Sequence, residues 1–237
     1  MNIRGIQKFS LIDYPGKISC VLFVGNCNCR CPYCHNPCLV FDPESQHGIS
    51  EEEVFVFLEK RRGKLDGVVI SGGEPSLRRN LAEFAGKIKE MGFLVKLDTN
   101  GSNPEQVIEY IENGLIDALG IDYKAPSSMY NEVTLSNIPD FAGRVHKIIN
   151  FAVGKNVFIV IRTTVHKKLL SYHDLQIMRK ELSGAGQKKW VLQQFNPVEI
   201  IDDDLLESPT YSDEELVQIA KTLGDTNVRG LKGFFVH

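Results

Sequence analysis

Short apolar runs alternate with amphipathic stretches along most of the chain. The runs are rich in Val, Ile and Leu, as in strands that are buried on both faces. The strands predicted from these runs lie at residues 18–24, 67–71, 93–98, 117–122, 157–163 and 190–195, with a last short strand near Phe234.

The stretches between the runs carry apolar residues at helical spacing and helix-start signals. Ser50 is a predicted N-cap with Glu53 at the capping-box position, and Pro104 occupies a first-turn position. The predicted helices cover residues 51–62, 77–91, 104–113, 141–154, 171–182 and 212–223.

The alternation gives about six βα units, which predict an α/β fold with a parallel sheet covered by helices. Six units are too few for a closed eight-fold barrel, so we expect an open or partial (β/α)6 TIM-like barrel, with a doubly wound sheet as the alternative. In either arrangement the ligand site lies at the carboxyl ends of the strands. We expect one domain over 1–237, with a core at about 18–196 and a C-terminal extension at about 197–237.

Composition narrows the class of protein. The chain has 237 residues, of which 43% are hydrophobic and 24% charged, with a net charge of −3. This balance argues against a non-specific nucleic-acid binder. No apolar run approaches the roughly 20 residues of a membrane span, and residues 1–10 show no signal region. We therefore expect a cytoplasmic protein that does not contact membranes or nucleic acids.

All six cysteines lie between Cys20 and Cys38. A disulfide framework would spread its cysteines to close loops, so this clustering indicates metal or redox chemistry. Cys27, Cys31 and Cys34 have the spacing C-x3-C-x2-C. Three thiolates on one loop can hold three corners of a cubane iron–sulfur cluster and leave the fourth iron open, unlike the four-cysteine ferredoxins.

Other uses of these cysteines remain open at this point. A structural zinc site would need four ligands, which Cys38 or His35 could complete. Cys29 could replace Cys27 in the ligand set or could simply be packed. Cys20, on an apolar strand, is predicted to be a core residue, and Cys38 a free thiol rather than a ligand.

Polar residues follow the predicted strands. Gly72, Gly73 and Glu74 come after the second strand, where the glycines permit close approach to the backbone and Glu74 can accept a hydrogen bond from an ammonium group. The third and fourth strands end in further polar side chains, which could equally form ordinary salt bridges: Asp98, Thr99, Asn100, Asp122 and Lys124. Alternation places Asp122 and Lys124 on the same face. His166 and His173 have polar neighbours and are predicted to lie at the surface.

The cysteine loop resembles that of the radical S-adenosylmethionine (radical SAM) enzymes. Its Cys-Pro-Tyr-Cys-His-Asn-Pro sequence is similar to that of their glycyl-radical-enzyme activases, which include the pyruvate formate-lyase activating enzymes. Residues 8–16, 97–101 and 191–195 resemble the branch that activates anaerobic ribonucleoside-triphosphate reductase. The resemblance covers about residues 3–196. Cys29 departs from it, because the family usually has an apolar or aromatic residue there.

The resemblance implies roles for individual residues. Cys27, Cys31 and Cys34 would bind a [4Fe-4S] cluster, and Gly72, Gly73 and Glu74 the amino group of S-adenosylmethionine. Other polar residues would contact the rest of that cofactor: Lys124 and Arg162 its carboxylate, Asn196 and the strand-end acids Asp98 and Asp122 its ribose, and Tyr33 its adenine. Thr99 and Asn100 would also belong to the cofactor-binding residues. Arg162 could instead pair with a strand-end acid. Asp98, Thr99 and Asp122 would also form a monovalent cation site.

The resemblance also implies a reaction and partners. The enzyme would reductively cleave S-adenosylmethionine to methionine and a 5′-deoxyadenosyl radical, which takes a hydrogen atom from a glycine of a partner enzyme. The implied partner is anaerobic ribonucleotide reductase or a related glycyl radical enzyme, and the implied electron donor is of the flavodoxin or ferredoxin type. Two alternatives are a radical SAM enzyme acting on a small molecule and a zinc or electron-transfer module.

Overall fold

The computed structural model describes residues 1–232, which form two compact units. The first unit comprises Met1–Asn28 and Asn36–Gly120, and the second comprises Cys29–His35 and the chain from Ile121 onward. The expected single domain, with its core and extension, stays a prediction. The predicted strand near Phe234 lies outside the described residues.

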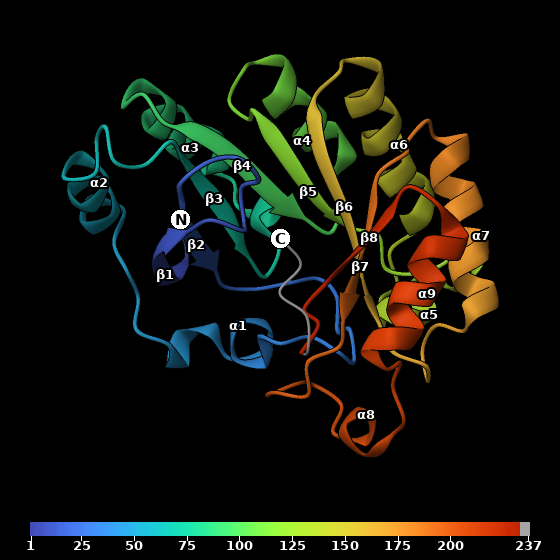
Figure 1. Ribbon diagram of the computed structural model, residues 1–237. Coiled ribbons are helices and arrows are strands. Elements are labelled where there is room, and N and C mark those ends of the chain that lie inside the picture. Colours follow the sequence, from blue (N-terminus) through green and yellow to red (C-terminus); the bar gives the residue numbers. More distant parts are fainter. Residues whose placement is uncertain (233–237) are drawn as a thin grey trace. The chain divides into compact units, whose positions relative to one another are not determined.

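The first unit contains the first strands of the sheet and four helices (Figure 1). Along the chain its elements are β1 (Ile3–Ser10), β2 (Ser19–Val24), α1 (Pro37–Phe41), α2 (Glu51–Glu59), β3 (Gly67–Gly72), α3 (Leu81–Glu90), β4 (Leu94–Thr99), α4 (Pro104–Glu112) and the start of β5 (Ala118–Asp122), with short 3-10 turns at Pro43–Ser45 and Pro75–Leu77.

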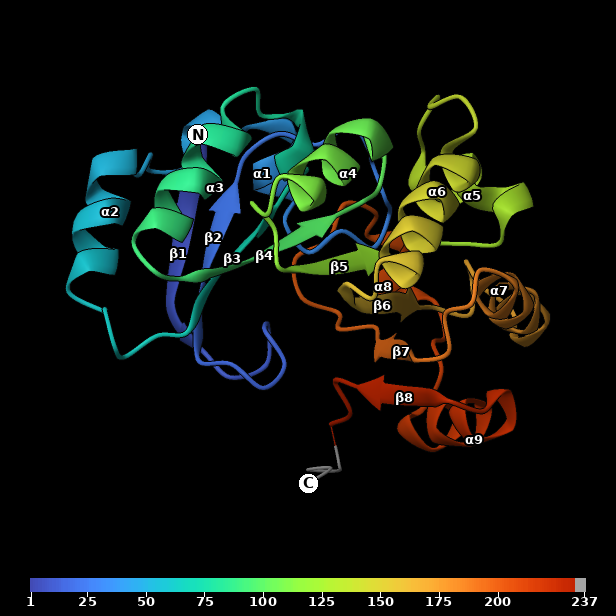
Figure 2. The ribbon, with the colours of Figure 1, turned by 90° about the horizontal axis from the view of Figure 1, so that it is seen from above.

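The second unit contains the end of β5 and the remaining elements. These are a 3-10 turn (Ser127–Met129), α5 (Tyr130–Thr134), α6 (Phe141–Gly154), β6 (Phe158–Val165), α7 (Tyr172–Gly184), β7 (Trp190–Gln194), α8 (Asp204–Glu207), α9 (Asp213–Leu223) and β8 (Thr226–Arg229). Figure 2 shows α9 beside β8.

The strands follow one another in the sheet as they do in the chain. In the first unit β2, β3 and β4 pair in parallel, and in the second unit β6, β7 and β8 do the same. The six strands predicted between residues 18 and 195 are thus present, and their parallel pairing is confirmed for β2 with β3, β3 with β4 and β6 with β7. Strand β8 was not predicted. Their side chains form the core; Val68, Val69 and Ile70 of β3, for example, are fully buried.

Strand β1 was not expected, and it pairs antiparallel with β2. The register between them shifts twice, between Ile3 and Gly5 and between Gln7 and Ser10. Such irregularities break the two-residue repeat of side chains, so the apolar residues of this strand do not alternate and the sequence gives no strand pattern there.

The predicted helix starts are largely confirmed. Ser50 accepts a hydrogen bond from the Glu53 amide, and the Glu53 carboxylate accepts one from the Ser50 amide, as in a capping box. Helix α3 begins at Leu81, later than predicted, because Pro75–Leu77 forms a separate 3-10 turn.

The environment of Cys20 agrees with its predicted core position. Its side chain is fully buried, and burial raises the pKa of its thiol to about 12.

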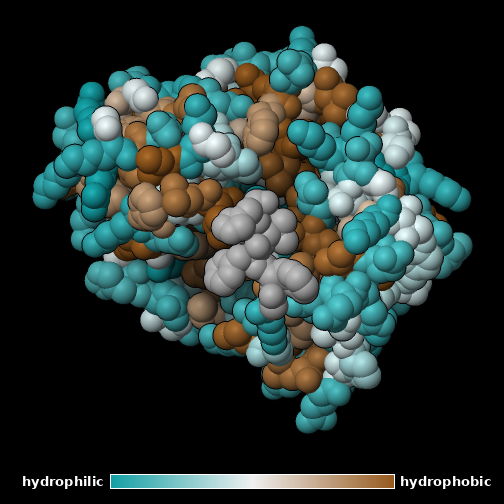
Figure 3. All heavy atoms as spheres, viewed as in Figure 1, coloured by the Kyte–Doolittle hydropathy of each residue, from teal (hydrophilic) through white to brown (hydrophobic). Residues whose placement is uncertain are grey.

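On the face of the molecule seen in Figure 3, hydrophilic residues dominate, with apolar patches between them. Among residues 1–232, no helix has the length and apolar character needed to cross a bilayer.

The end of β3 packs directly on the end of β2. Gly72 has a φ of +111°, and a Cβ there would lie 2.5 Å from the backbone nitrogen of Val24. A Cβ on Gly73 would lie 2.6 Å from the carbonyl carbon of Asn26. The Gly73 amide donates to the Val24 carbonyl at 2.8 Å, and the Glu74 amide to the Asn26 carbonyl at 2.8 Å. The two glycines therefore admit the chain's own backbone, at the start of the cysteine loop.

This packing predicts that Gly73→Ala destabilises the protein. The added methyl group would overlap the Asn26 carbonyl, so the free energy of unfolding should fall by more than about 2 kcal/mol. Gly154→Ala is the matched control, because a Cβ at this last residue of α6 meets nothing within 4 Å. Urea denaturation should show a change within about 1 kcal/mol for the control, and equal stability of the two variants would contradict the packing argument.

Candidate active site at the strand ends

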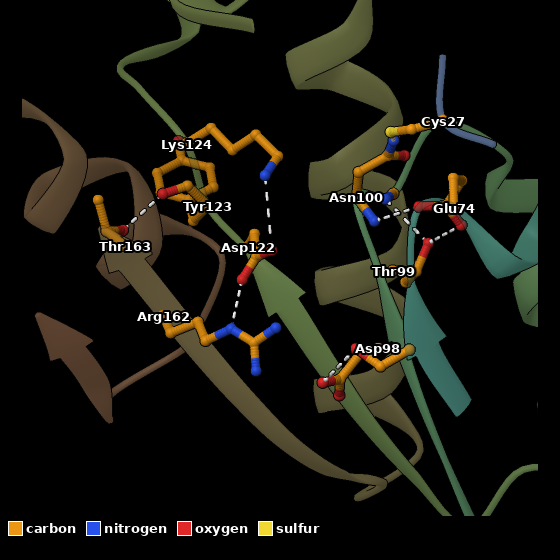
Figure 4. A network of polar contacts seen from close by, with 12 residues as sticks. Cys27, Glu74, Asp98, Thr99, Asn100, Asp122, Tyr123, Lys124, Arg162 and Thr163 are labelled. Atoms are coloured by element: carbon orange, nitrogen blue, oxygen red, sulfur yellow. Dashed lines mark hydrogen bonds and ion pairs between the residues drawn. The ribbon is translucent and has the colours of Figure 1, made fainter. Parts of the chain in front are cut away.

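A buried glutamate joins the turn after β3 to the turn after β4. The Glu74 side chain is fully buried. Its Oε1 accepts hydrogen bonds from the Thr99 hydroxyl at 2.7 Å and the Ser76 amide at 3.0 Å, and its Oε2 accepts one from the Asn100 amide at 2.6 Å. Figure 4 shows Glu74 beside Thr99 and Asn100. Burial raises the pKa of Glu74, while these three donors act in the opposite direction.

Asn100 extends this connection to the cysteine loop. Its side-chain amide donates to Asn28 Oδ1 at 2.8 Å and lies 3.9 Å from the sulfur of Cys27. Its own Oδ1 accepts from the Ser102 amide, and Ser102 in turn accepts from the Asn28 amide group at 2.9 Å. The predicted site residues Glu74, Thr99, Asn100 and Cys27 are therefore brought together within the first unit.

Asp98 forms a buried ion pair with a lysine of its own strand. Lys96 Nζ contacts Asp98 Oδ1, and both side chains are almost wholly buried. The Ser71 hydroxyl donates to the other carboxylate oxygen at 3.3 Å. Asp98 and Lys96 are two residues apart in β4 and so lie on one face of the strand.

Strands β5 and β6 place three predicted residues together in the second unit. The Asp122 carboxylate contacts Arg162 Nε and lies 3.5 Å from Lys124 Nζ (Figure 4). Burial would raise the pKa of Asp122, but the charges of Arg162 and Lys124 outweigh it and lower the pKa to about 2. The carboxylate is therefore ionised throughout the physiological range, and Arg162 pairs with a strand-end acid, one of its two predicted partners.

Lys124 is also close to the cysteine loop. Its ammonium group lies 5.8 Å from the centre of the Tyr33 ring, and both side chains are buried. Burial opposes the charge of Lys124, but the neighbouring groups, including Cys31 and Asp122, raise its pKa well above the ordinary value. Lys124 thus brings a positive charge to this part of the loop.

The surroundings of Cys31 lower the pKa of its thiol. A hydrogen bond from Cys29 is the main cause, the charge of Lys124 adds to it, and together they outweigh burial to lower the pKa of Cys31 to about 6. The thiolate is the form that binds iron. Cys29, the departure from the family pattern, therefore supports the thiolate of Cys31 in this structure.

Of the two histidines predicted to lie at the surface, only one does. His173 is exposed, as predicted, but the prediction that His166 lies at the surface is wrong, because its side chain is fully buried. One ring nitrogen contacts the Leu205 carbonyl at 3.1 Å, the other accepts from the Lys168 amide at 3.1 Å, and the ring packs edge-on against Phe195 at 4.8 Å. These local contacts satisfy the buried ring, and the polar neighbours in sequence gave no indication of them.

The end of β7 opens onto a cavity. Asn196 lies two residues beyond the end of β7 and is exposed. A cavity of about 340 Å³ lies beside it in the second unit, lined among others by Gln194, Phe195 and Thr210. Its position at the carboxyl end of a parallel strand agrees with the expected location of a ligand site.

The donor set suits an iron–sulfur cluster with a nucleoside cofactor. Cys27, Cys31 and Cys34 lie on one loop and are not in disulfides, and the pKa of Cys31 is lowered. In residues 1–232, no three His, Cys, Asp or Glu side chains surround a point where a single metal ion would bind. A four-iron cluster binds each thiolate at a different iron, so its ligands need not meet at one point.

The family of the chain follows from its sequence. The profile of the Radical SAM superfamily matches residues 21–165, which is more than half of the chain. The chain belongs to the radical SAM superfamily. The matched range contains the cysteine loop, the Gly-Gly-Glu turn and the polar ends of β4, β5 and β6.

Individual relatives agree with this assignment. A putative glycyl-radical enzyme activating enzyme of Methanocaldococcus jannaschii is 35% identical over 240 residues, covering 98% of this chain and 98% of that protein. The pyruvate formate-lyase-activating enzyme of Clostridium pasteurianum is 31% identical over 221 residues, covering 79% of this chain and 88% of that protein.

Solved structures show the same fold. The crystal structure of Streptococcus suis SuiB bound to precursor peptide SuiA has a TM-score of 0.68 at 14% sequence identity. The match covers 89% of this chain but 48% of that one, so this radical SAM chain spans about half the length of SuiB.

These comparisons confirm several predictions. The α/β fold class with the radical SAM core of the partial (β/α)6 type is confirmed, as is the resemblance to glycyl-radical-enzyme activases. The protein is a radical SAM enzyme, and its cofactors are a [4Fe-4S] cluster and S-adenosylmethionine. The individual cluster ligands and cofactor-binding residues stay predictions.

Sequence reasoning missed Lys96 and the role of Cys29. A charged residue inside a predicted buried strand was the available indication for Lys96, because such a residue requires a partner. For Cys29 the sequence left a packed residue or an alternative ligand open, and only the contact with Cys31 shows what its thiol does.

The network around Glu74 predicts the effect of Glu74→Gln. The amide replaces one acceptor oxygen with a donor, so at least one of the three buried hydrogen bonds should be lost and the free energy of unfolding should fall by about 1–3 kcal/mol. Urea denaturation measures the change.

The matched control is Glu83→Gln. Glu83 pairs with Lys87 one helical turn away on an exposed surface, and both side chains reach solvent. This substitution should change the stability by no more than about 0.5 kcal/mol. A loss for Glu74→Gln as small as that of the control would show that the buried network does not stabilise the fold.

Proposed function

We propose that this radical SAM enzyme generates a glycyl radical on a partner enzyme, and that the partner is an anaerobic ribonucleoside-triphosphate reductase. The names of the two relatives support the activation of a glycyl radical enzyme. The resemblance of residues 8–16, 97–101 and 191–195 to the reductase-activating branch supports the choice of partner.

Roles follow for the residues of the chain. Cys27, Cys31 and Cys34 would hold the cluster, and the Gly72–Glu74 turn would receive the amino group of S-adenosylmethionine. Lys124 and Arg162 would face its carboxylate, and the chain would shield the reacting groups from water. When bound, the reduced cluster and S-adenosylmethionine supply one-electron chemistry that breaks the sulfonium bond to C5′ and lets the nucleoside fragment take a hydrogen atom.

Further side chains would contact the nucleoside. Tyr33 would meet the adenine, and Asn196 and the strand-end acid Asp122 would contact the ribose. The electron would come from a flavodoxin- or ferredoxin-type protein. None of the six cysteines, all of which lie in the described residues, is in a disulfide, which agrees with a reducing, cytoplasmic location.

A protein partner is supported by an apolar turn between β1 and β2. Leu11 and Ile12 are 60% and 68% exposed, and the neighbouring Phe9 is 57% exposed. Exposed apolar residues that gather on one segment are typical of a surface that binds another protein. We call Phe9, Leu11 and Ile12 the apolar turn.

The apolar turn is held in place by its polar and buried neighbours. The Ser10 hydroxyl accepts from the amides of Ile12 and Asp13 and donates to the Asp13 carboxylate at 2.5 Å. Tyr14 is buried against Val21. The apolar side chains are thus displayed on an ordered turn, which favours docking because less conformational entropy is lost on binding.

The test of the function is anaerobic reconstitution with iron and sulfide, followed by measurement of 5′-deoxyadenosine. With reductant, S-adenosylmethionine and the reductase, we expect 5′-deoxyadenosine together with a glycyl radical signal on the reductase in electron paramagnetic resonance. Turnover of a small molecule with no radical on any protein would contradict the proposal.

The ligand assignment predicts the effect of single cysteine substitutions. Cys27→Ala, Cys31→Ala and Cys34→Ala should each abolish formation of 5′-deoxyadenosine, because each removes one thiolate from the three-ligand set. Cys29→Ala and Cys38→Ala are the matched controls and should retain it. Iron and labile sulfide analysis should follow the same division. Retention of activity by Cys27→Ala and loss by Cys29→Ala would show that the assumed ligand set is wrong.

The apolar turn predicts a variant that separates partner recognition from cofactor cleavage. Leu11→Ser with Ile12→Ser should lower the rate of partner activation at least tenfold, because the apolar contact area is removed. It should leave partner-independent cleavage of S-adenosylmethionine unchanged. Val56→Ser, at a half-exposed position on α2, is the matched control. Partner activation equal to that of the control would exclude the apolar turn from the docking surface.

A further inference from the structure

A lysine occupies the place where the sequence predicted a monovalent cation. Lys96 is 1% exposed, and its ammonium group pairs with Asp98, which is 6% exposed. A single charge buried to this extent is strongly disfavoured unless an opposite charge accompanies it. Asp98 therefore has its counter-charge from within the chain.

The backbone leaves room for this ammonium group. A Cβ at Gly120 of the neighbouring β5 would lie 2.8 Å from Lys96 Nζ and 3.0 Å from the carboxyl carbon of Asp98. Gly120 therefore admits the ion pair, and the Ser71 hydroxyl contacts the same carboxylate from β3. Residues of three strands of the first unit thus surround the ammonium group of Lys96 and its carboxylate partner.

The other predicted cation ligands are also engaged. The Thr99 hydroxyl donates to Glu74 and accepts from the Gly101 amide at 3.1 Å. Asp122, in the second unit, has Arg162 and Lys124 as cationic partners. The residues present therefore do not fit the monovalent cation site that the resemblance implied.

We propose that Lys96 is a built-in cation that replaces a free monovalent ion at the carboxyl end of β4. The fold of this edge then requires neither K⁺ nor Na⁺. The consequence for S-adenosylmethionine, that its binding is also independent of these ions, rests on the proposed function.

The test compares salts of equal ionic strength. The full-length protein is melted in tetramethylammonium chloride, whose cation is too bulky to take the place of a buried ammonium group, and in potassium, sodium or ammonium chloride. The wild type should melt at the same temperature in all four. This measurement needs no variant and is overturned by a saturable stabilisation of the wild type by K⁺, Na⁺ or NH₄⁺.

Lys96→Met should create the missing cation site. Loss of the ammonium group removes the lysine that pairs with the buried Asp98 carboxylate, so the melting temperature in tetramethylammonium chloride should fall by about 10 °C. K⁺, Na⁺ or NH₄⁺ should restore much of the lost melting temperature, with an effect that saturates as the concentration rises. Equal recovery in tetramethylammonium chloride, or no recovery in any of the four salts, would overturn the proposal.

Two further variants provide controls. Lys96→Met with Asp98→Asn removes both charges and should show no response to small cations; a retained response would overturn the proposal. Lys89→Met removes a half-exposed partner of Asp117 and should likewise show no cation response. A response equal to that of Lys96→Met would overturn the proposal too.

The affinity for S-adenosylmethionine separates this proposal from the proposed function. It is measured by titration of the reconstituted wild type in the same salts. Equal affinity in all four salts is expected, whereas tighter binding in one alkali salt would overturn the independence of binding from monovalent ions. If the reconstituted wild type binds no S-adenosylmethionine, the proposed function fails, and the melting temperatures still decide the role of Lys96.

Discussion

The buried carboxylate of Glu74 is the interaction on which the arrangement of the first unit depends. It accepts hydrogen bonds from the turn after β3 and from the turn after β4, and Asn100 continues the connection to Cys27. The Gly-Gly pair before it brings the backbone of β3 onto the start of the cysteine loop. A buried carboxylate is tolerated only when hydrogen-bond donors of the protein replace the water molecules it has lost. The fold therefore fixes these three segments together, and with them the first cysteine of the proposed cluster site.

In the second unit, charged side chains at the ends of β5 and β6 determine the protonation of their neighbours. Arg162 and Lys124 keep Asp122 ionised, and Lys124 contributes to the thiolate character of Cys31. Cys29 adds a hydrogen bond from its own thiol to Cys31. The second proposed cluster ligand, Cys31, thus lies among groups that favour the iron-binding thiolate, and the third, Cys34, belongs to the same unit.

The sequence predicted the repeating elements and failed where tertiary contacts decide. The parallel strands were predictable because each is a continuous apolar run, and Ser50 marked its helix because a capping box is a local device. Strand β1 escaped because its irregular pairing breaks the alternation. Lys96 was overlooked although Asp98 is only two residues away, because the space at Gly120 of β5 and the Ser71 hydroxyl of β3 join this pair only in the folded sheet. His166 was assigned to the surface from its neighbours in sequence, whereas Leu205, far along the chain, supplies its buried contact.

Much of the site could be predicted from the sequence, because short motifs indicate the cluster and the cofactor before any geometry is known. The spacing of Cys27, Cys31 and Cys34 indicated an open cluster, and the Gly-Gly-Glu turn indicated the cofactor. The reason given for the glycines was incomplete: they admit the backbone at Val24 and Asn26, which no local pattern reveals.

The most direct test of the central claim follows a hydrogen atom from the partner. The reductase is prepared with glycine deuterated at Cα and incubated anaerobically with the reconstituted enzyme, reductant and S-adenosylmethionine, and the 5′-deoxyadenosine is analysed by mass spectrometry. If the enzyme takes the hydrogen atom from the glycine, we expect one deuterium in the 5′-deoxyadenosine and a radical on the labelled glycine. Turnover that yields unlabelled 5′-deoxyadenosine, with no radical on the reductase, would contradict it.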